Sequence, residues 1–167
     1  MQIHSGAYRT VSLLAAILIL AFAHSRLLAA ADVLTLGVVA DGKTDTSAAL
    51  QHILDTGETD LYFPAGDYLL GGIKVPEKSH LSFAPKARVI AVDRGSEVVT
   101  EIDPAGRGRE VLRRVPLFTI IGDDVLLDGV RFDFFKNGTA KVPFPTDRLI
   151  YASGVNGLTI RNFVVIN

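Results

Sequence analysis

The sequence predicts an all-β protein, a right-handed parallel β-helix (solenoid) with one N-terminal capping helix, and three observations lead to this fold class. Nearly every strand-like segment beyond residue 32 is three to five residues long and is followed by Gly, Pro, Asn or Asp. Residues 125–133 and 158–166 repeat one pattern at an offset of 33: a strand, a polar corner and a second strand. After the N-terminal segment, only residues 46–55 have apolar residues at the spacing of a helix. Strands this short bury too little alone, so the coils must stack.

Composition excludes several classes of site and partner. The chain has 167 residues, the size of one ordinary domain, and its 17 Lys and Arg residues nearly balance 18 Asp and Glu residues. A net charge of −1 gives no strong field for nucleic acid. Because the chain has no Cys, it has no disulfide framework, thiolate zinc site or cysteine nucleophile. His52 and His80 have no partner at metal-ligand spacing, so we predict no metal site and no cofactor.

The N-terminus has the three-part pattern of a secretory leader. Arg9 precedes an apolar run at residues 11–23, which is shorter than the roughly 20 residues that cross a bilayer. Small residues follow at 29–31, so we expect a signal peptide over residues 1–31 with cleavage after Ala31, and cleavage after Ala23 as the alternative. The remaining domain, residues 32–167, is expected to be secreted or periplasmic and to have no membrane span.

The predicted helix at about residues 46–55 has a clear beginning and end. Asp45 or Thr44 can accept hydrogen bonds from the exposed first-turn amides, and Gly57 supplies the stop. We expect this helix to cover the first coil, whose backbone and apolar interior would otherwise form an open sheet edge.

The other elements are short strands and corners. A strand is predicted at 33–36 and a turn cluster at 41–45. Further strands are predicted at 60–63, 68–70, 73–75, 80–83, 88–92, 118–121, 125–127, 130–134, 149–151, 158–160 and 163–166. An insertion with loop composition is expected at about 136–147, and another insertion is expected at about 93–115. A β-sandwich is the alternative, but it would show longer alternating strands joined by two-residue hairpin loops.

Two stretches resemble a known superfamily. Residues 40–51, read ADGKTDTSAALQ, and residues 61–68, read LYFPAGDY, resemble the N-terminal signature of the pectate-lyase-like superfamily. The run from GIKV at 72–75 to ARVI at 87–90 is similar to its polygalacturonase branch. The resemblance covers residues 36–92 well and the rest only as generic coils.

The resemblance implies a polysaccharide partner, often rich in uronates, bound in a groove along one sheet. In the hydrolase branch one carboxylic acid protonates the glycosidic oxygen while others activate water, with about 6.5 to 9.5 Å between the groups. The lyase branch uses Ca²⁺ and a basic residue instead, so Ca²⁺ is expected only if the protein is a lyase.

The candidate catalytic residues are few. The hydrolase branch would show Asn-Thr-Asp, Asp-Asp, Gly-His-Gly and Arg-Ile-Lys in order, and this sequence contains only Asp123-Asp124. That pair precedes Val125 as a corner between strands, where Asp is common for structural reasons, and this structural interpretation is favoured. The chain also ends within a coil at residues 164–167, so we expect an N-terminal part of a longer protein whose catalytic residues would lie beyond Asn167. We expect no turnover from this chain alone.

Basic and aromatic residues in and around the insertions are the candidate substrate-binding groups. Arg offers forked donors to carboxylates, although a solvated loop of mixed charge explains the same composition. The candidates are Arg107, Arg109, Arg113 and Arg114 with Glu101 in the first insertion, and Lys136, Lys141 and Arg148 around the second. Aromatic residues that could stack on sugar rings are Phe132, Phe134, Phe135, Phe144 and Tyr151.

The expected function is that of a secreted polysaccharide-active β-helix protein, a polygalacturonase-like glycoside hydrolase fragment lacking its catalytic coils. The alternatives are a non-catalytic carbohydrate-binding or adhesive β-helix protein, a polysaccharide lyase, and a structural surface protein without a glycan ligand.

Overall fold

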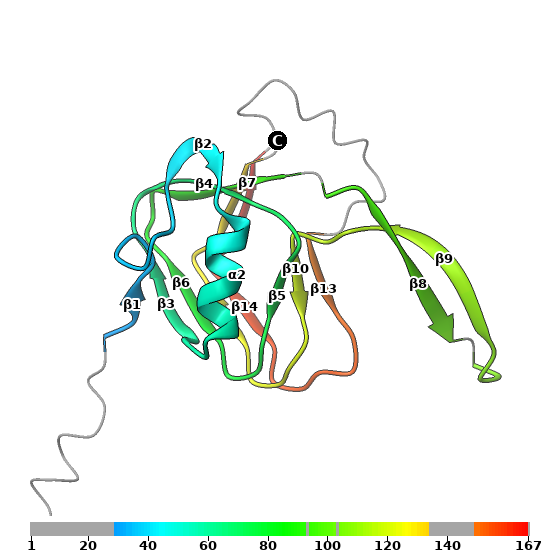
Figure 1. Cartoon of the computed structure of the whole chain (residues 1–167). Helices are drawn as coiled ribbons and strands as arrows, with labels where there is room; N and C mark the ends of the chain where they lie inside the picture. The colour runs from blue at the N-terminus through cyan, green and yellow to red at the C-terminus, as the bar shows by residue number, and fades with distance from the viewer. Residues whose placement is uncertain (1–28, 93, 103, 134–148, 167) are drawn as a thin grey trace, which may run out of the picture.

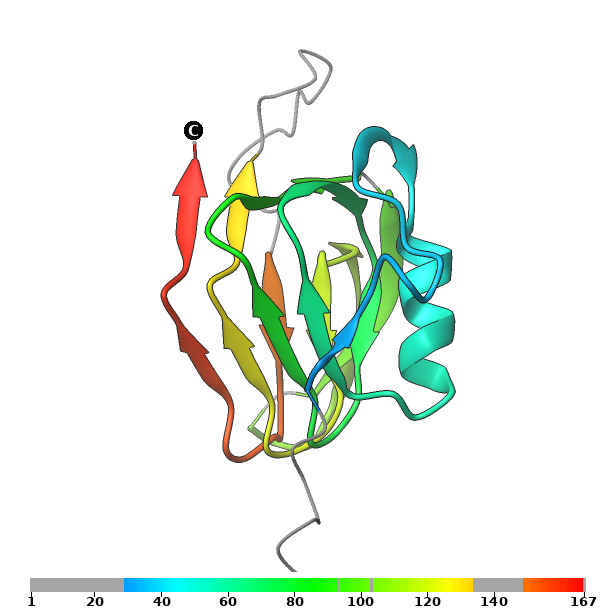
Figure 2. The same ribbon diagram turned by 90° about the vertical axis from the view of Figure 1, so that its left-hand side faces the viewer.

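The chain winds into a right-handed parallel β-helix, as the sequence predicts. A computed structural model describes residues 29–92, 94–102, 104–133 and 149–166. Its strands stack coil upon coil from the N-terminal end, where the helix lies, to the last strands at the opposite end (Figures 1 and 2). Every pairing between coils is parallel, which excludes the sandwich alternative.

Three sheets form the walls of this prism. Sheet A contains β1 (Ala31–Asp32), β3 (Asp60–Phe63), β6 (His80–Phe83), β11 (Leu126–Asp128) and β14 (Thr159–Arg161). Sheet B contains β2 (Asp41–Asp45), β4 (Gly66–Leu70), β7 (Ala87–Ala91), β12 (Arg131–Asp133) and β15 (Val164–Ile166). Sheet C contains β5 (Ile73–Val75), β10 (Phe118–Ile120) and β13 (Ile150–Ala152).

Apolar side chains in register form the core. Leu61, Leu81 and Leu127 occupy one column of sheet A and are completely buried. The rings of Phe63 and Phe83 stack in the same sheet with centroids 4.2 Å apart. Each such side chain contacts its equivalent in the neighbouring coil, so the burial that a short strand cannot achieve alone is shared along the column.

The corner between sheets A and B is tight. Gly129 adopts a φ of 81°, and a Cβ there would lie 2.6 Å from the Phe83 carbonyl oxygen of the preceding coil. The equivalent corner of the next coil carries Asn162, also left-handed with a φ of 55°. Glycine and asparagine tolerate this conformation best, so the repeated polar corner seen in the sequence reflects backbone geometry.

The predicted capping helix is α2 (Ser47–Asp55), which buries Leu50, Ile53 and Leu54. Asp45 accepts hydrogen bonds from the Ser47 N–H (3.1 Å) and the Ser47 hydroxyl (2.7 Å), as one of the two capping predictions requires. The Thr44 hydroxyl instead donates to Asp41 at 2.8 Å, and Thr46, directly before the helix, makes no side-chain capping hydrogen bond.

One side chain of α2 closes the edge of sheet C. The Gln51 Oε1 atom accepts a hydrogen bond from the Lys74 N–H at 2.8 Å, and Gln51 Nε2 donates to the Lys74 carbonyl at 3.2 Å. The side-chain amide therefore bonds the exposed edge of β5 in the way that another strand would.

Three predicted segments differ from the structure. Residues 33–36 form a turn, in which the Val38 N–H donates to the Val33 carbonyl, and the strand lies just before them in β1. Residues 41–45 contain the expected turn, because the Asp41 carboxylate accepts from two backbone N–H groups, yet Asp41 and Asp45 also pair with β4 as the irregular strand β2. Residues 93–115, expected to be a loop, contain two strands described below.

Other predictions fall partly or wholly outside the described residues. The leader is outside them up to residue 28, and its expected cleavage site after Ala31 lies within β1, where Ala31 is in register with Leu61. The second insertion, 136–147, is outside them entirely. No helix in the described part of the chain is long and apolar enough to span a membrane.

Asp123 and Asp124 form the corner between sheets C and A. The Asp123 carboxylate accepts from the backbone N–H of Asn156 in the next coil at 2.8 Å and from its side-chain amide at 3.4 Å. The backbone hydrogen bond from Asn156 is the main cause that lowers the pKa of Asp123. Asp124 has a φ of 58°, and its N–H donates to the Asn156 carbonyl at 2.9 Å. Both residues therefore connect two coils.

Replacing Gln51 by Ala tests the closure of sheet C. Two backbone groups of Lys74 lose their partner, so we expect the free energy of unfolding to fall by about 1 to 2 kcal/mol in urea titrations. The control is His52→Ala, which removes an exposed side chain from the same helix. Equal stability of the two variants would show that Gln51 does not close the edge.

The lowered pKa of Asp123 predicts a pH-dependent contribution to stability. A carboxylate with a depressed folded-state pKa stabilises the fold above its unfolded value, near 3.8, and loses this effect as the pH falls through the folded value. Asp123→Ala should therefore lower the urea midpoint at pH 6, and the difference from wild type should shrink below about pH 4. A difference that is constant from pH 6 to pH 2.5, with Glu77→Ala as the exposed control, would contradict this role.

Candidate functional site

A β-hairpin projects from the β-helix between sheets B and C. Its strands β8 (Ser96–Ile102) and β9 (Gly108–Arg114) pair antiparallel along their whole length, with Val99 opposite Val111. The hairpin extends away from α2 and beyond the body of the prism (Figure 1). It follows β7 and precedes β10, so a long insertion at one corner presents side chains beside the outer face of sheet C.

The two faces of the hairpin differ in composition. Side chains alternate along a strand, so Val98 and Leu112 share one face, where both are exposed. Glu101, Val99 and Arg113 share the other face and are partly buried. The partly buried face, which carries both signs of charge, contributes most of the hairpin side of a cleft.

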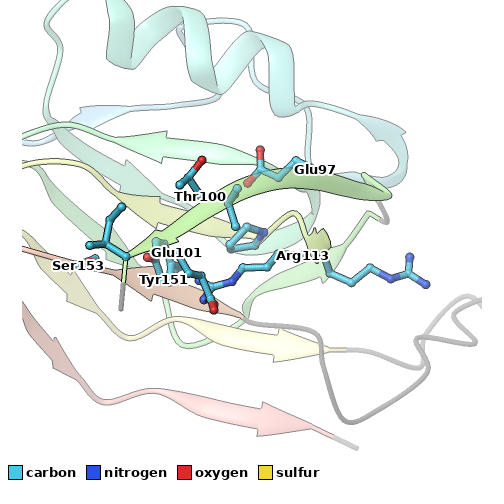
Figure 3. A pocket seen from close by; sticks show the side chains of 10 residues that line it. Glu97, Thr100, Glu101, Arg113, Tyr151 and Ser153 are labelled. Atoms are coloured by element: carbon cyan, nitrogen blue, oxygen red, sulfur yellow. The ribbon is translucent and has the colours of Figure 1, made fainter. Parts of the chain in front are cut away.

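The cleft has a volume of about 450 Å³ and lies between the hairpin and the coil that carries β13. Side chains from both elements gather there, with Tyr151 and Ser153 approaching from the β13 side (Figure 3). Tyr151 points outward because it is in register with Thr119 and alternates with Ile150, which packs on the core. The lining residues are Glu97, Val99, Thr100, Glu101, Ile102, Arg113, Arg114, Pro116, Tyr151 and Ser153.

Arg113 connects the two walls. Its guanidinium pairs with the Glu101 carboxylate across the hairpin, and its Cζ atom lies 5.8 Å from the centroid of the Tyr151 ring. Arg109 Nη2 lies 3.5 Å from the other oxygen of Glu101. Arg109 is mostly exposed and Arg113 mostly buried, with side-chain exposures of 77% and 23%. Glu101 therefore pairs closely with Arg113, which lies over the ring, and only loosely with the exposed Arg109.

The cleft has two carboxylates, but they do not form a free pair. Glu97 and Glu101 are four residues apart on one strand, which separates their Cα atoms by about 13 Å. Glu101 is ion-paired with Arg113, so it is held as a charge partner. An aromatic ring, guanidinium groups and the hydroxyls of Thr100 and Ser153 suit recognition of a polar ligand.

The structure brings together some of the predicted binding residues. Arg113, Arg114 and Tyr151 line the cleft, and Arg109 does not line it but contacts the lining residue Glu101. Arg107 lies beyond them in the turn of the hairpin. The predicted residues Lys136, Lys141 and Arg148, with Phe134, Phe135 and Phe144, lie outside the described residues. Phe132 is a core residue that is 1% exposed.

The catalytic candidates Asp123 and Asp124 do not line the cleft. Sequence reasoning missed Glu97, Thr100 and Ser153. The alternation of Glu97, Val99 and Glu101, mirrored by Arg109, Val111 and Arg113, is a signal that could have revealed a hairpin with opposite charges paired across one face. The described residues contain no group of three or more His, Asp and Glu side chains that could hold a metal ion.

No protein-family model matches the sequence, and no curated protein matches it either. Solved structures do match it. An iota-carrageenase complexed to iota-carrageenan fragments aligns over 80% of this chain and 28% of its own, with a TM-score of 0.58 and 17% identity. An iota-carrageenase from A. fortis gives the same TM-score and identity, with 80% and 27% coverage. PfbA, a surface adhesin of Streptococcus pneumoniae, aligns over 81% of this chain and 33% of its own, with a TM-score of 0.57 and 20% identity.

At these identities the likeness concerns the fold. The chain spans about a third or less of the length of each of these proteins. Together with the three parallel sheets, the likeness establishes that the chain is a right-handed parallel β-helix.

Proposed function

We propose that this chain is the polysaccharide-binding part of a secreted β-helix protein, and that it binds an acidic polysaccharide in the hairpin cleft. The observation that carries the proposal is Arg113, held over the Tyr151 ring by Glu101 in a cleft open to solvent. The likeness to a β-helix enzyme solved with iota-carrageenan fragments, and to a surface adhesin, supports a glycan ligand.

The residues of the cleft suit a sugar with an acidic group. An aromatic ring such as that of Tyr151 can pack on the apolar face of a sugar, while hydroxyls and guanidinium groups orient the polar substituents of the sugar. A planar guanidinium binds a carboxylate or sulfate through two parallel hydrogen bonds. Arg109 is the more available cation, because it is mostly exposed and its contact with Glu101 is long at 3.5 Å.

Binding, without turnover by this chain, agrees best with the cleft. Inverting hydrolysis needs a proton donor and a free base on opposite sides of the glycosidic bond, at a separation of about 6.5 to 9.5 Å. Glu101 is occupied by Arg113 and lies on the same strand as Glu97. We propose that any polygalacturonase-like hydrolysis by the full protein uses residues outside this chain, and that Ca²⁺ is needed only by a lyase.

A non-catalytic adhesive role is the second candidate. The ion pairs of Glu101 favour it, because both carboxylate oxygens contact a guanidinium and neither is free to act as an acid or a base. The two candidates share the binding step and differ in whether the full-length protein releases new reducing ends from the bound polysaccharide.

Tyr151→Ala tests the binding step. We expect it to weaken binding of an acidic oligosaccharide about tenfold in isothermal titration calorimetry, because the ring and its contact with Arg113 are lost together. Thr119→Ala is the matched control, since Thr119 occupies the same outward column of sheet C without lining the cleft. Thermal melting of both variants verifies the fold.

Comparing acidic with neutral oligosaccharides tests whether binding depends on the charge of the ligand. An oligogalacturonate and a sulfated oligosaccharide should bind more tightly than a neutral oligosaccharide, and Arg109→Gln should reduce this preference most at low salt. If none of the three ligands binds, or if Tyr151→Ala and Thr119→Ala bind equally, the proposed function is wrong.

A further inference from the structure

A second hollow lies at the corner between sheets A and B, whereas the hairpin leaves from the corner between sheets B and C. It has two adjacent parts of about 590 and 330 Å³, and Pro85 and Arg131 line both of them. The larger part is also lined by Lys86 and Arg88, and the smaller by Asp128. We call these two adjacent parts together the corner trough. Its position on the prism separates it from the hairpin cleft.

The acidic residue that lines the larger part, Asp67, is paired with Arg88. Arg88 binds Asp67 through two hydrogen bonds, from Nε at 2.7 Å and from Nη2 at 3.0 Å. Its third nitrogen, Nη1, lies 3.6 Å from Asp133 on the next coil. Arg88 thus sits between two carboxylates of the neighbouring coils, and these three groups together carry a formal charge of −1.

The acid of the smaller part is neutralised in the same way. Asp128 accepts from Arg161 Nη2 and from Asn162 Nδ2, both at 2.8 Å. The hydrogen bond from Arg161 is the main cause that lowers the pKa of Asp128, so this carboxylate is ionised and paired at neutral pH. It contributes no unbalanced negative charge.

Two further cations, Lys86 and Arg131, bring the formal charge around the larger part to +1. Among the residues that the structure describes, neither Lys86 nor Arg131 makes an ion pair, and Arg131 is half-buried and lines both parts. Phe132 pairs with Val89, so Arg131 lies opposite Arg88 on the neighbouring coil. A partly desolvated guanidinium is stabilised by an anion beside it.

We propose that the corner trough binds a carboxylate or sulfate group of an acidic glycan between Arg131 and Lys86. Lys86 lies two residues before Arg88, which is opposite Arg131 on the neighbouring coil, so the Cα atoms of Lys86 and Arg131 are about 8 Å apart. Side chains as long as these can both reach one oxyanion across that distance. Pro85 adds an apolar surface to the lining of both parts, which suits a sugar ring more than a free ion. This inference goes beyond the proposed function, because it adds a second, independent contact.

The consequence is bivalent binding. A polysaccharide long enough to contact both the hairpin cleft and the corner trough would bind more tightly than a short oligosaccharide, because the second contact forms at a high effective concentration. A short oligosaccharide would fill the two sites separately.

Residue-resolved NMR titration of the 167-residue chain with a sulfated oligosaccharide tests the trough. We expect the amide signals of Gly129 and Asn162, which line the trough, to shift as the ligand is added. Lys86→Gln and Arg131→Gln should each lower the affinity measured from these shifts about tenfold. Lys78→Gln is the control, because Lys78 is paired with Glu77 at the other corner. Lys86 is exposed, so its variant retains the fold even if Arg131→Gln does not.

The outcomes distinguish binding at the corner trough from binding in the hairpin cleft. Shifts at Gly129 and Asn162 that persist in Tyr151→Ala support the trough whether or not the cleft binds. The proposal is overturned if both variants respond like Lys78→Gln. It is also overturned if inorganic sulfate binds as tightly as the sulfated oligosaccharide, or if a single-stranded oligonucleotide binds more tightly.

Discussion

The parallel register of inward apolar side chains is the constraint on which the rest of the structure depends. Leu61, Leu81 and Leu127 form one column only if each coil begins at the same position as the coil beneath it. Side-chain alternation then fixes which residues point outward, because a shift of one residue would turn every buried side chain to solvent. The placement of Tyr151 in the hairpin cleft and of Arg131 in the corner trough follows from that register.

Inward, corner and outward positions of the β-helix carry different types of residue. Inward positions carry large apolar residues, and corners carry residues that accept left-handed backbone or bond the next coil, as Gly129 and Asp123 do. Outward positions and insertions are released from packing and can carry charge. Both proposed contacts with an acidic glycan lie on such positions, on different corners of one rigid prism.

The sequence was enough to predict the fold, but it indicated only some of the residues that line the hairpin cleft. Repeated corners and short strands leave a periodic signal, so the stacking and helix α2 could be predicted. Sequence reasoning missed the hairpin strands β8 and β9, because each alone mixes charged and apolar residues as a solvated loop does. Their opposite charges become a signal only when the two segments are compared as partners. Arg113 and Tyr151 were named separately, but their contact joins residues far apart in the chain, and only the winding of the coils brings them together.

A crystal structure of the chain with a bound acidic oligosaccharide tests the central claim most directly, since it examines the register and the outward surfaces at once. The account predicts parallel coils with Leu81 beside Leu127, a sugar ring on Tyr151 and an acidic substituent at Arg109 or Arg113. Strands that fold back antiparallel, or a sugar bound away from both the hairpin cleft and the corner trough, would contradict it.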